Sequence, residues 1–169
     1  MAMQRFHMRW IPQPLAHIVP AVLIAGGICI GVASSTAAPN ADAQPIYGTL
    51  QLKSPFKPDP VKVSVSAGGE VNARELGFHP GCTGFFNPEA PHIRLNYTSS
   101  GIAMQVYVGS AADTTLIIRT PDGSWRCDDD SLAKNPAVRF AQPKDGTYDI
   151  WVGAFGGGRP QADVHITER

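Results

Sequence analysis

The sequence lacks an excess of either charge: 14 Lys and Arg residues balance 14 Asp and Glu residues, and the formal net charge is zero. Because it has no basic stretch, the chain lacks the electrostatic footprint of a nucleic-acid-binding protein. It also lacks helical patterning, since no segment after residue 43 keeps an apolar period of about 3.6 residues. The 17 Gly and 15 Pro residues argue against a helical bundle, and a hydrophobic content of 43% argues against a disordered chain.

Long hydrophobic runs are scarce as well, and the clearest lies near the N-terminus. Residues 18–32 (IVPAVLIAGGICIGV) are apolar but fall short of the roughly 20 residues that a spanning helix needs. Arg5 and Arg9 precede this run, and an A-x-A cleavage motif ends at Ala43. We therefore predict a signal peptide over residues 1–43, a secreted or periplasmic protein, and no stable membrane span after cleavage. A permanent N-terminal anchor is the alternative.

Cysteine is rare, with 3 residues in the sequence, of which only Cys82 and Cys127 follow the predicted leader. In an oxidising compartment, an isolated pair of this kind is expected to form a disulfide. The alternative is a zinc site in which His79 and His92 complete the ligand set. Because paired C-x-x-C spacing is absent, the pattern favours the disulfide.

Strand-like alternation dominates the rest of the chain. Apolar and polar residues alternate in about eight segments: residues 46–52, 61–66, 93–98, 102–108, 116–118, 138–140, 148–152 and 162–167. The turn sequences PDG (residues 121–123) and KDG (residues 144–146) separate some of them. Many short alternating strands predict an all-β, antiparallel β-sandwich formed by residues 44–169 as a single domain.

One stretch carries a family resemblance. DTTLIIRTPDGSWRCDDDS, followed by NPAVRF and DGTYDIWVGAF, resembles the bacterial pre-peptidase C-terminal (PPC) domain family. The matching positions are an Asp beside an apolar strand, an acidic run and a G-x-Y-x-I-x-V strand: Asp113, residues 128–130, Gly146, Tyr148, Ile150 and Val152. The resemblance implies a jelly-roll-like sandwich and calcium, without catalysis. The chain departs from the family pattern because no protease accompanies the domain.

Aspartates form the strongest local cluster of charge. We predict that Asp113, Asp128, Asp129 and Asp130 bind a structural Ca²⁺, because calcium takes six to eight oxygen ligands and would relieve the repulsion between adjacent carboxylates. The spacing is not that of an EF-hand. The alternative is a solvated turn in which these residues only keep the chain soluble.

Catalytic motifs are missing from the sequence. It contains no G-x-S-x-G motif and no visibly activated nucleophile, and His79, His92 and His165 are expected in loops or on polar strand faces. We therefore predict no catalytic residues. A small secreted hydrolase or peptidase-associated protein is the alternative.

Outward-facing aromatic residues favour a binding role. By alternation, Tyr107 and Trp151 point away from the apolar face of their strands and are candidates for a ligand surface. The alternative is that a loop or the Pro-rich segment before residue 61 covers them. The sequence thus predicts a non-enzymatic binding or accessory module whose partner is a protein, the cell envelope or a carbohydrate. The sequence does not distinguish this binding module from an exported scaffold that has no ligand.

Overall fold

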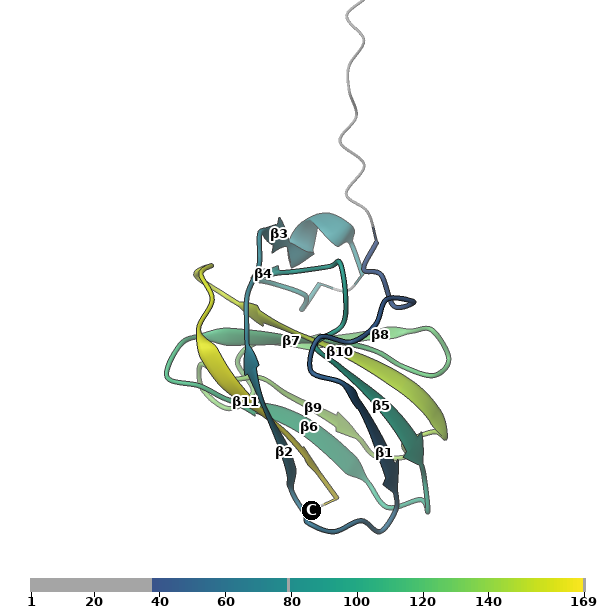
Figure 1. The fold of residues 1–169 in the computed structure, drawn as a ribbon. Helices are drawn as coiled ribbons and strands as arrows, with labels where there is room; N and C mark the ends of the chain where they lie inside the picture. The colour runs from purple at the N-terminus through teal and green to yellow at the C-terminus, as the bar shows by residue number, and fades with distance from the viewer. Residues whose placement is uncertain (1–37, 79, 169) are drawn as a thin grey trace, which may run out of the picture. The chain divides into compact units, whose positions relative to one another are not determined.

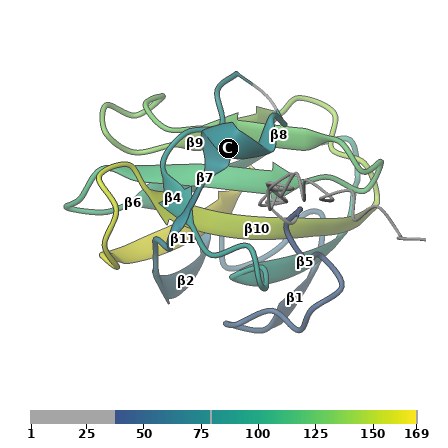
Figure 2. The same ribbon diagram turned by 90° about the horizontal axis from the view of Figure 1, so that it is seen from above.

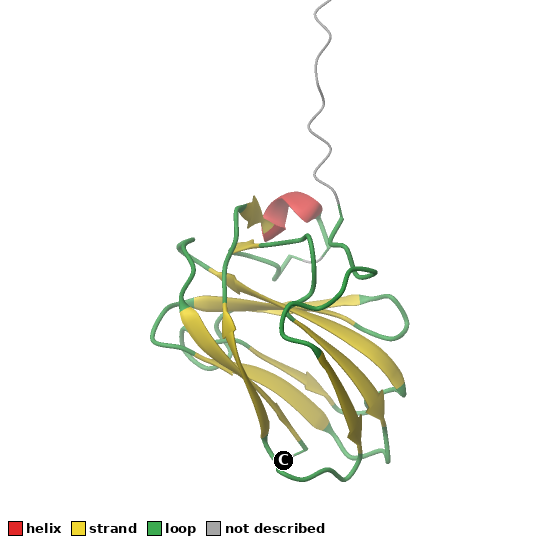
Figure 3. Ribbon diagram, viewed as in Figure 1, coloured by secondary structure: helices red, strands yellow, loops and turns green. Residues whose placement is uncertain are grey.

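The fold is described for residues 38–78 and 80–168 of a computed structural model. These residues lie within one compact unit, Ser35–Arg169. They form two β-sheets packed face to face, which confirms the predicted all-β sandwich (Figures 1 and 3). Residues 1–37, which hold most of the predicted signal peptide, lie outside the described residues. Within the described part of the chain, no helix is long and apolar enough to cross a bilayer.

The larger sheet contains seven strands. β10 (Gly146–Ala154) is central and pairs with β5 (Ile93–Thr98) on one side and with β7 (Thr114–Arg119) on the other. The remaining strands are β1 (Thr49–Lys53) beside β5, β8 (Trp125–Asp128) beside β7, β4 (Phe85–Phe86) at the end of β10, and β3 (Val71–Asn72) beside β4. All pairs are antiparallel except β1 with β5, which is parallel.

The smaller sheet has four strands in an antiparallel arrangement. Their spatial order is β2 (Val61–Ser66), β11 (Gln161–Thr167), β6 (Met104–Gly109) and β9 (Ala137–Phe140). The eight segments predicted from alternation all contain strands of the two sheets, whereas β3, β4 and β8 were not predicted.

The main core lies between the two sheets. Successive side chains of a strand point to opposite faces, so the apolar residues of each alternating segment share one face. In β5 this places Ile93, Leu95 and Tyr97 in the core while Arg94 and Asn96 point outward. β6 follows the same rule, with Val106 and Val108 buried in the core.

A second, smaller core covers part of the outer face of the larger sheet. It lies under residues 71–78 and 80–91, here called the cap, which contain β3, a single 3-10 turn (Ala73–Leu76) and β4. Seen from above, β4 lies by β10 and β7 and leaves β1 and β5 clear (Figure 2). The cap explains why β7 and β10 are buried on both faces: Ile117 and Trp151 are fully covered.

The disulfide predicted between Cys82 and Cys127 is confirmed, and the zinc alternative is therefore wrong. It joins the cap to β8, with the two Cα atoms 5.0 Å apart. It adds a covalent attachment to the pairing of the two-residue strand β4 with β10.

Candidate functional site

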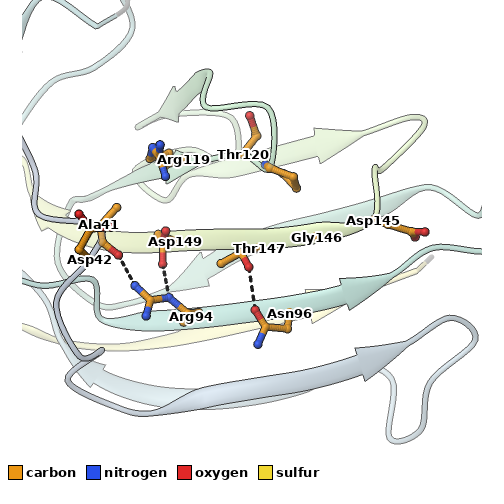
Figure 4. Close-up of a pocket in the computed structure, with 11 residues that line it drawn as sticks. Ala41, Asp42, Arg94, Asn96, Arg119, Thr120, Asp145, Gly146, Thr147 and Asp149 are labelled. Carbon is orange, nitrogen blue, oxygen red and sulfur yellow. Dashed lines mark hydrogen bonds and ion pairs between the residues drawn. The ribbon is translucent and has the colours of Figure 1, made fainter.

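The part of the larger sheet's outer face that the cap leaves uncovered forms an open depression of about 630 Å³, here called the groove (Figure 4). Its lining is almost entirely polar: Ala41, Asp42, Arg94, Asn96, Arg119, Thr120, Pro121, Asp145, Gly146, Thr147 and Asp149. Its floor is formed by β5, β10 and β7 (Figure 4).

Strand register arranges the floor in two rows. Arg94, Asp149 and Arg119 are cross-strand neighbours on β5, β10 and β7 and form the first row. Asn96 and Thr147 form the second row, two residues further along the strands, and the Thr147 hydroxyl donates to Asn96 Oδ1 at 2.9 Å. These side chains face outward because the residues between them on the same strands fill the main core.

An ion pair with little solvent contact fixes the first row. Arg94 Nε lies 2.7 Å from Asp149 Oδ1, and the two side chains are 20% and 4% exposed. The Nη2 group of Arg94 also donates to the backbone carbonyls of Ala41 and Ala43. Arg94 is thus held by one carboxylate and two carbonyls of the protein, and it neutralises a carboxylate that would be costly to bury alone.

Arg119, in contrast, has no partner for its guanidinium among residues 38–78 and 80–168. Its side chain is partly buried and lines the groove, and it forms no hydrogen bond or ion pair with any other residue in the described parts of the chain. Two further charged residues line the groove. Asp42 is exposed, and Asp145 Oδ1 accepts from the backbone N–H of Ser99 at 2.6 Å. Arg119 therefore has donors available to a ligand.

Local hydrogen bonds hold one wall of the groove. The backbone N–H of Asn40 donates to the carbonyl of Pro88 in the cap at 2.8 Å. The Asn40 side chain in turn accepts from the backbone N–H groups of Asp42 and Ala43, both at 3.1 Å. Residues 40–43, which the sequence places at the end of the leader, therefore lie against the folded domain.

Close packing shapes the opposite wall. Gly146 begins β10 with a φ of +126°, and a Cβ atom there would meet the Pro121 side chain at 2.8 Å. Only glycine tolerates both the backbone conformation and the contact. The adjacent turn is held by Asp122, which accepts from the Thr120 hydroxyl at 2.6 Å.

The predicted calcium ligands bind the protein itself. Asp128 accepts from the backbone N–H groups of Ser131 and Ala137 at 3.0 and 2.8 Å and from the Ser131 hydroxyl at 2.8 Å. Asp129 accepts from the Thr83 hydroxyl at 2.6 Å. These contacts tie together the loop before β9 and link it to the cap.

The other two residues of the acidic cluster are Asp113 and Asp130. The negative charge of Asp129, followed by burial and by Asp113 and Asp128, raises the pKa of Asp130. Asp113 Oδ1 is buried without a hydrogen-bond partner. Among the described residues, however, no three Asp, Glu, His or Cys side chains are placed to hold a metal ion. Calcium therefore stays a prediction from the sequence.

The two predicted binding aromatics do not form one surface. Trp151 points away from the main core, as alternation predicts, but it has no exposed surface because the cap covers it. The predicted exposure of Trp151 is therefore wrong. Tyr107 lies on the outer face of the smaller sheet, where it stacks on His165 with ring centroids 4.6 Å apart. The two residues thus occupy opposite outer faces of the sandwich.

The histidines have structural surroundings. His92 is 2% exposed; its Nε2 lies 3.0 Å from the Ser66 carbonyl, and its Nδ1 accepts from the backbone N–H of Val152 at 3.3 Å. Burial lowers the pKa of both His92 and His165. No hydrogen bond joins the ring of either histidine to a hydroxyl or thiol side chain of the described residues. His79 lies outside the described residues.

Comparison with known proteins assigns no family. No family model matches the chain, so the resemblance to the pre-peptidase C-terminal family stays a prediction. No curated protein matches its sequence. Among solved structures, the chain is similar to the crystal structure of Aeromonas hydrophila PliG, a periplasmic lysozyme inhibitor of g-type lysozyme. The identity is 12% over 74% of this chain and 98% of that chain, with a TM-score of 0.38. A likeness of this degree identifies neither a family nor a function for this chain.

Proposed function

We propose that this chain is an exported, non-enzymatic binding module whose ligand lies in the groove. The observation that carries the proposal is the polar floor. A largely buried ion pair holds Arg94 and Asp149 there, while the neighbouring Arg119 has no partner among the described residues. A site of this kind offers fixed hydrogen-bonding groups to a ligand without requiring the protein to rearrange.

The position of these groups favours recognition. They project from the middle of a sheet whose strands are paired on both sides, so their spacing is set by the backbone ladder. Rigid elements hold side chains more accurately than loops do. The chemistry of the lining, with guanidinium, amide, hydroxyl and carboxylate groups, suits a polar ligand.

Export is supported by the leader-like apolar run of residues 18–32, which Arg5 and Arg9 precede, and by the disulfide. Disulfides persist in secreted and periplasmic proteins and are rare in reducing compartments. The bond between Cys82 and Cys127 links the cap to the sheet beside the groove, so an oxidising compartment would also favour an intact site.

A capture experiment with matched variants tests the proposal. The purified protein is immobilised and exposed to the medium and the solubilised envelope of the producing organism, alongside the groove variant Asn96→Ala/Arg119→Ala. A second variant, Tyr107→Ala, alters the outer face of the smaller sheet and serves as the control.

We expect the groove variant to lose the captured ligand and Tyr107→Ala to keep it. Capture that depends on Tyr107 and not on the groove would refute the assignment. Circular dichroism and the melting temperature of each variant show whether it is folded.

A further inference from the structure

The backbone of the groove floor is closed to a peptide ligand. β10 pairs with β5 and β7, β5 also pairs with β1, and β7 also pairs with β8. The N–H and C=O groups of these three strands are therefore used within the sheet. A peptide cannot join the floor as an added strand, and only side chains can contact a ligand there.

The lining also lacks the apolar surface on which other peptides dock. Amphipathic helices need an apolar groove, and polyproline segments need exposed aromatic rings. Apart from Ala41 and Pro121, every lining residue is polar or glycine. Trp151, which follows Asp149 on the outer face of β10, is fully buried under the cap. A ligand rich in hydroxyl groups fits this lining better than a peptide does.

The charged residues of the groove indicate which charge the ligand carries. Arg94 and Asp149 neutralise each other, and Asp145 accepts a backbone hydrogen bond. Of the described residues that line the floor, Arg119 is therefore the cation without a protein partner. A guanidinium binds a carboxylate through two parallel hydrogen bonds. The carboxylates of Asp42 and Asp145 line the same groove and would repel a polyanion.

From these observations, and resting on the proposed function, we infer that the ligand is an oligosaccharide that carries isolated carboxylates. Arg119 binds the carboxylate of one sugar, while Asn96 and Thr147 bind ring hydroxyls. The two rows of the floor are about 7 Å apart along the strands. This spacing lets the carboxylate and the hydroxyls of one short sugar segment contact both rows at once.

Titration with defined probes tests the inference on the purified, disulfide-bonded protein. The probes are neutral glucose tetramers in which one sugar is replaced by a uronic acid (galacturonate, glucuronate or mannuronate), the methyl esters of these tetramers, an unmodified glucose tetramer and a tetraglutamate peptide. The variants are Arg119→Gln and the matched control Arg126→Gln, which changes an exposed arginine on β8 outside the groove. Heat of binding and backbone amide chemical shifts are measured.

We expect at least one tetramer with a single uronic acid to bind, with chemical-shift changes at the groove. Both the methyl ester and Arg119→Gln should weaken this binding by about tenfold or more, the loss of one charge-assisted pair. Arg126→Gln should bind like the wild type. Equal binding of the acid and its ester, tighter binding of tetraglutamate, or no binding across the panel at millimolar concentration would overturn the inference.

The two proposals fail in different ways. If the capture experiment finds a groove-dependent ligand but the uronic acid panel does not bind, the binding function stands and the ligand class is wrong. If capture is unaffected by the groove variant, the proposed function itself fails.

Discussion

Protonation of His92 is expected to destabilise the domain in mild acid. The ring is almost fully buried, with Nε2 at hydrogen-bond distance from the Ser66 carbonyl and Nδ1 accepting from the Val152 N–H. This pattern corresponds to a neutral ring that carries its proton on Nε2. A second proton on Nδ1 would remove the acceptor for Val152 and place a charge in the interior. Burial accordingly lowers the pKa of His92 below its usual value of 6.5.

The sign and size of the effect follow from linkage. Below about pH 6.5 the unfolded chain binds a proton at this histidine that the folded chain does not bind. The contribution of His92 is therefore complete above this pH and is lost as the pH falls toward the lowered pKa of the folded state. The slope is at most about 1.4 kcal/mol per pH unit. Between pH 7.5 and pH 5 the loss is at most about 2 kcal/mol.

Urea unfolding at pH 7.5, 6.5, 5.5 and 5 measures this loss. The variant His92→Gln keeps a donor and an acceptor but cannot be protonated, so its unfolding free energy should fall less over this range than that of the wild type. His165→Gln is the matched control, because burial also lowers the pKa of His165 but that ring is more exposed. If wild type and His92→Gln lose the same free energy between pH 7.5 and pH 5, the reasoning about the buried ring is refuted.

Three further outcomes follow from the structure. Arg94→Met should lower the free energy of unfolding by about 3 to 5 kcal/mol because it leaves Asp149 buried and unpaired. In urea unfolding, the double variant Arg94→Met/Asp149→Leu should recover most of this loss. A double variant as unstable as Arg94→Met would contradict the argument. The melting temperature should be the same in millimolar calcium and in chelator, because Asp128 is already held by protein donors. A higher melting temperature in calcium would instead support the calcium site predicted from the sequence. N-terminal sequencing of the exported protein should find a start upstream of Asn40, since that residue is bonded to the cap; a start at Gln44 would contradict this.

Alternation allowed most strands to be predicted because one face of each meets the main core. β5 and β6 follow the period of two residue by residue. The same rule could not find β8, which ends at Asp128 where the acidic run begins, or the two-residue strands of the cap. The disulfide could be predicted because so few cysteines follow the leader.

The groove could not be predicted, because its members are distant in sequence. Arg94 and Asp149 are 55 residues apart and meet only because β5 and β10 are neighbours, which residue patterns do not indicate. Each is an ordinary polar residue of an alternating strand. The hydrogen bonds that Asp128 accepts from loop N–H groups likewise have no signature in the sequence. A cluster of carboxylates that stabilises a loop looks the same in sequence as one that binds an ion.

The cap gives the protein an internal spectroscopic reporter. Of the 3 tryptophans in the sequence, Trp10 lies in the predicted leader. The other two, Trp125 and Trp151, belong to the second core and lie 5.6 Å apart between ring centroids, beside the disulfide. Tryptophan emission of the exported protein therefore reports on the cap and not on the interior between the sheets. A red shift on mild reduction, with β-sheet circular dichroism unchanged, would reveal the cap opening separately from global unfolding.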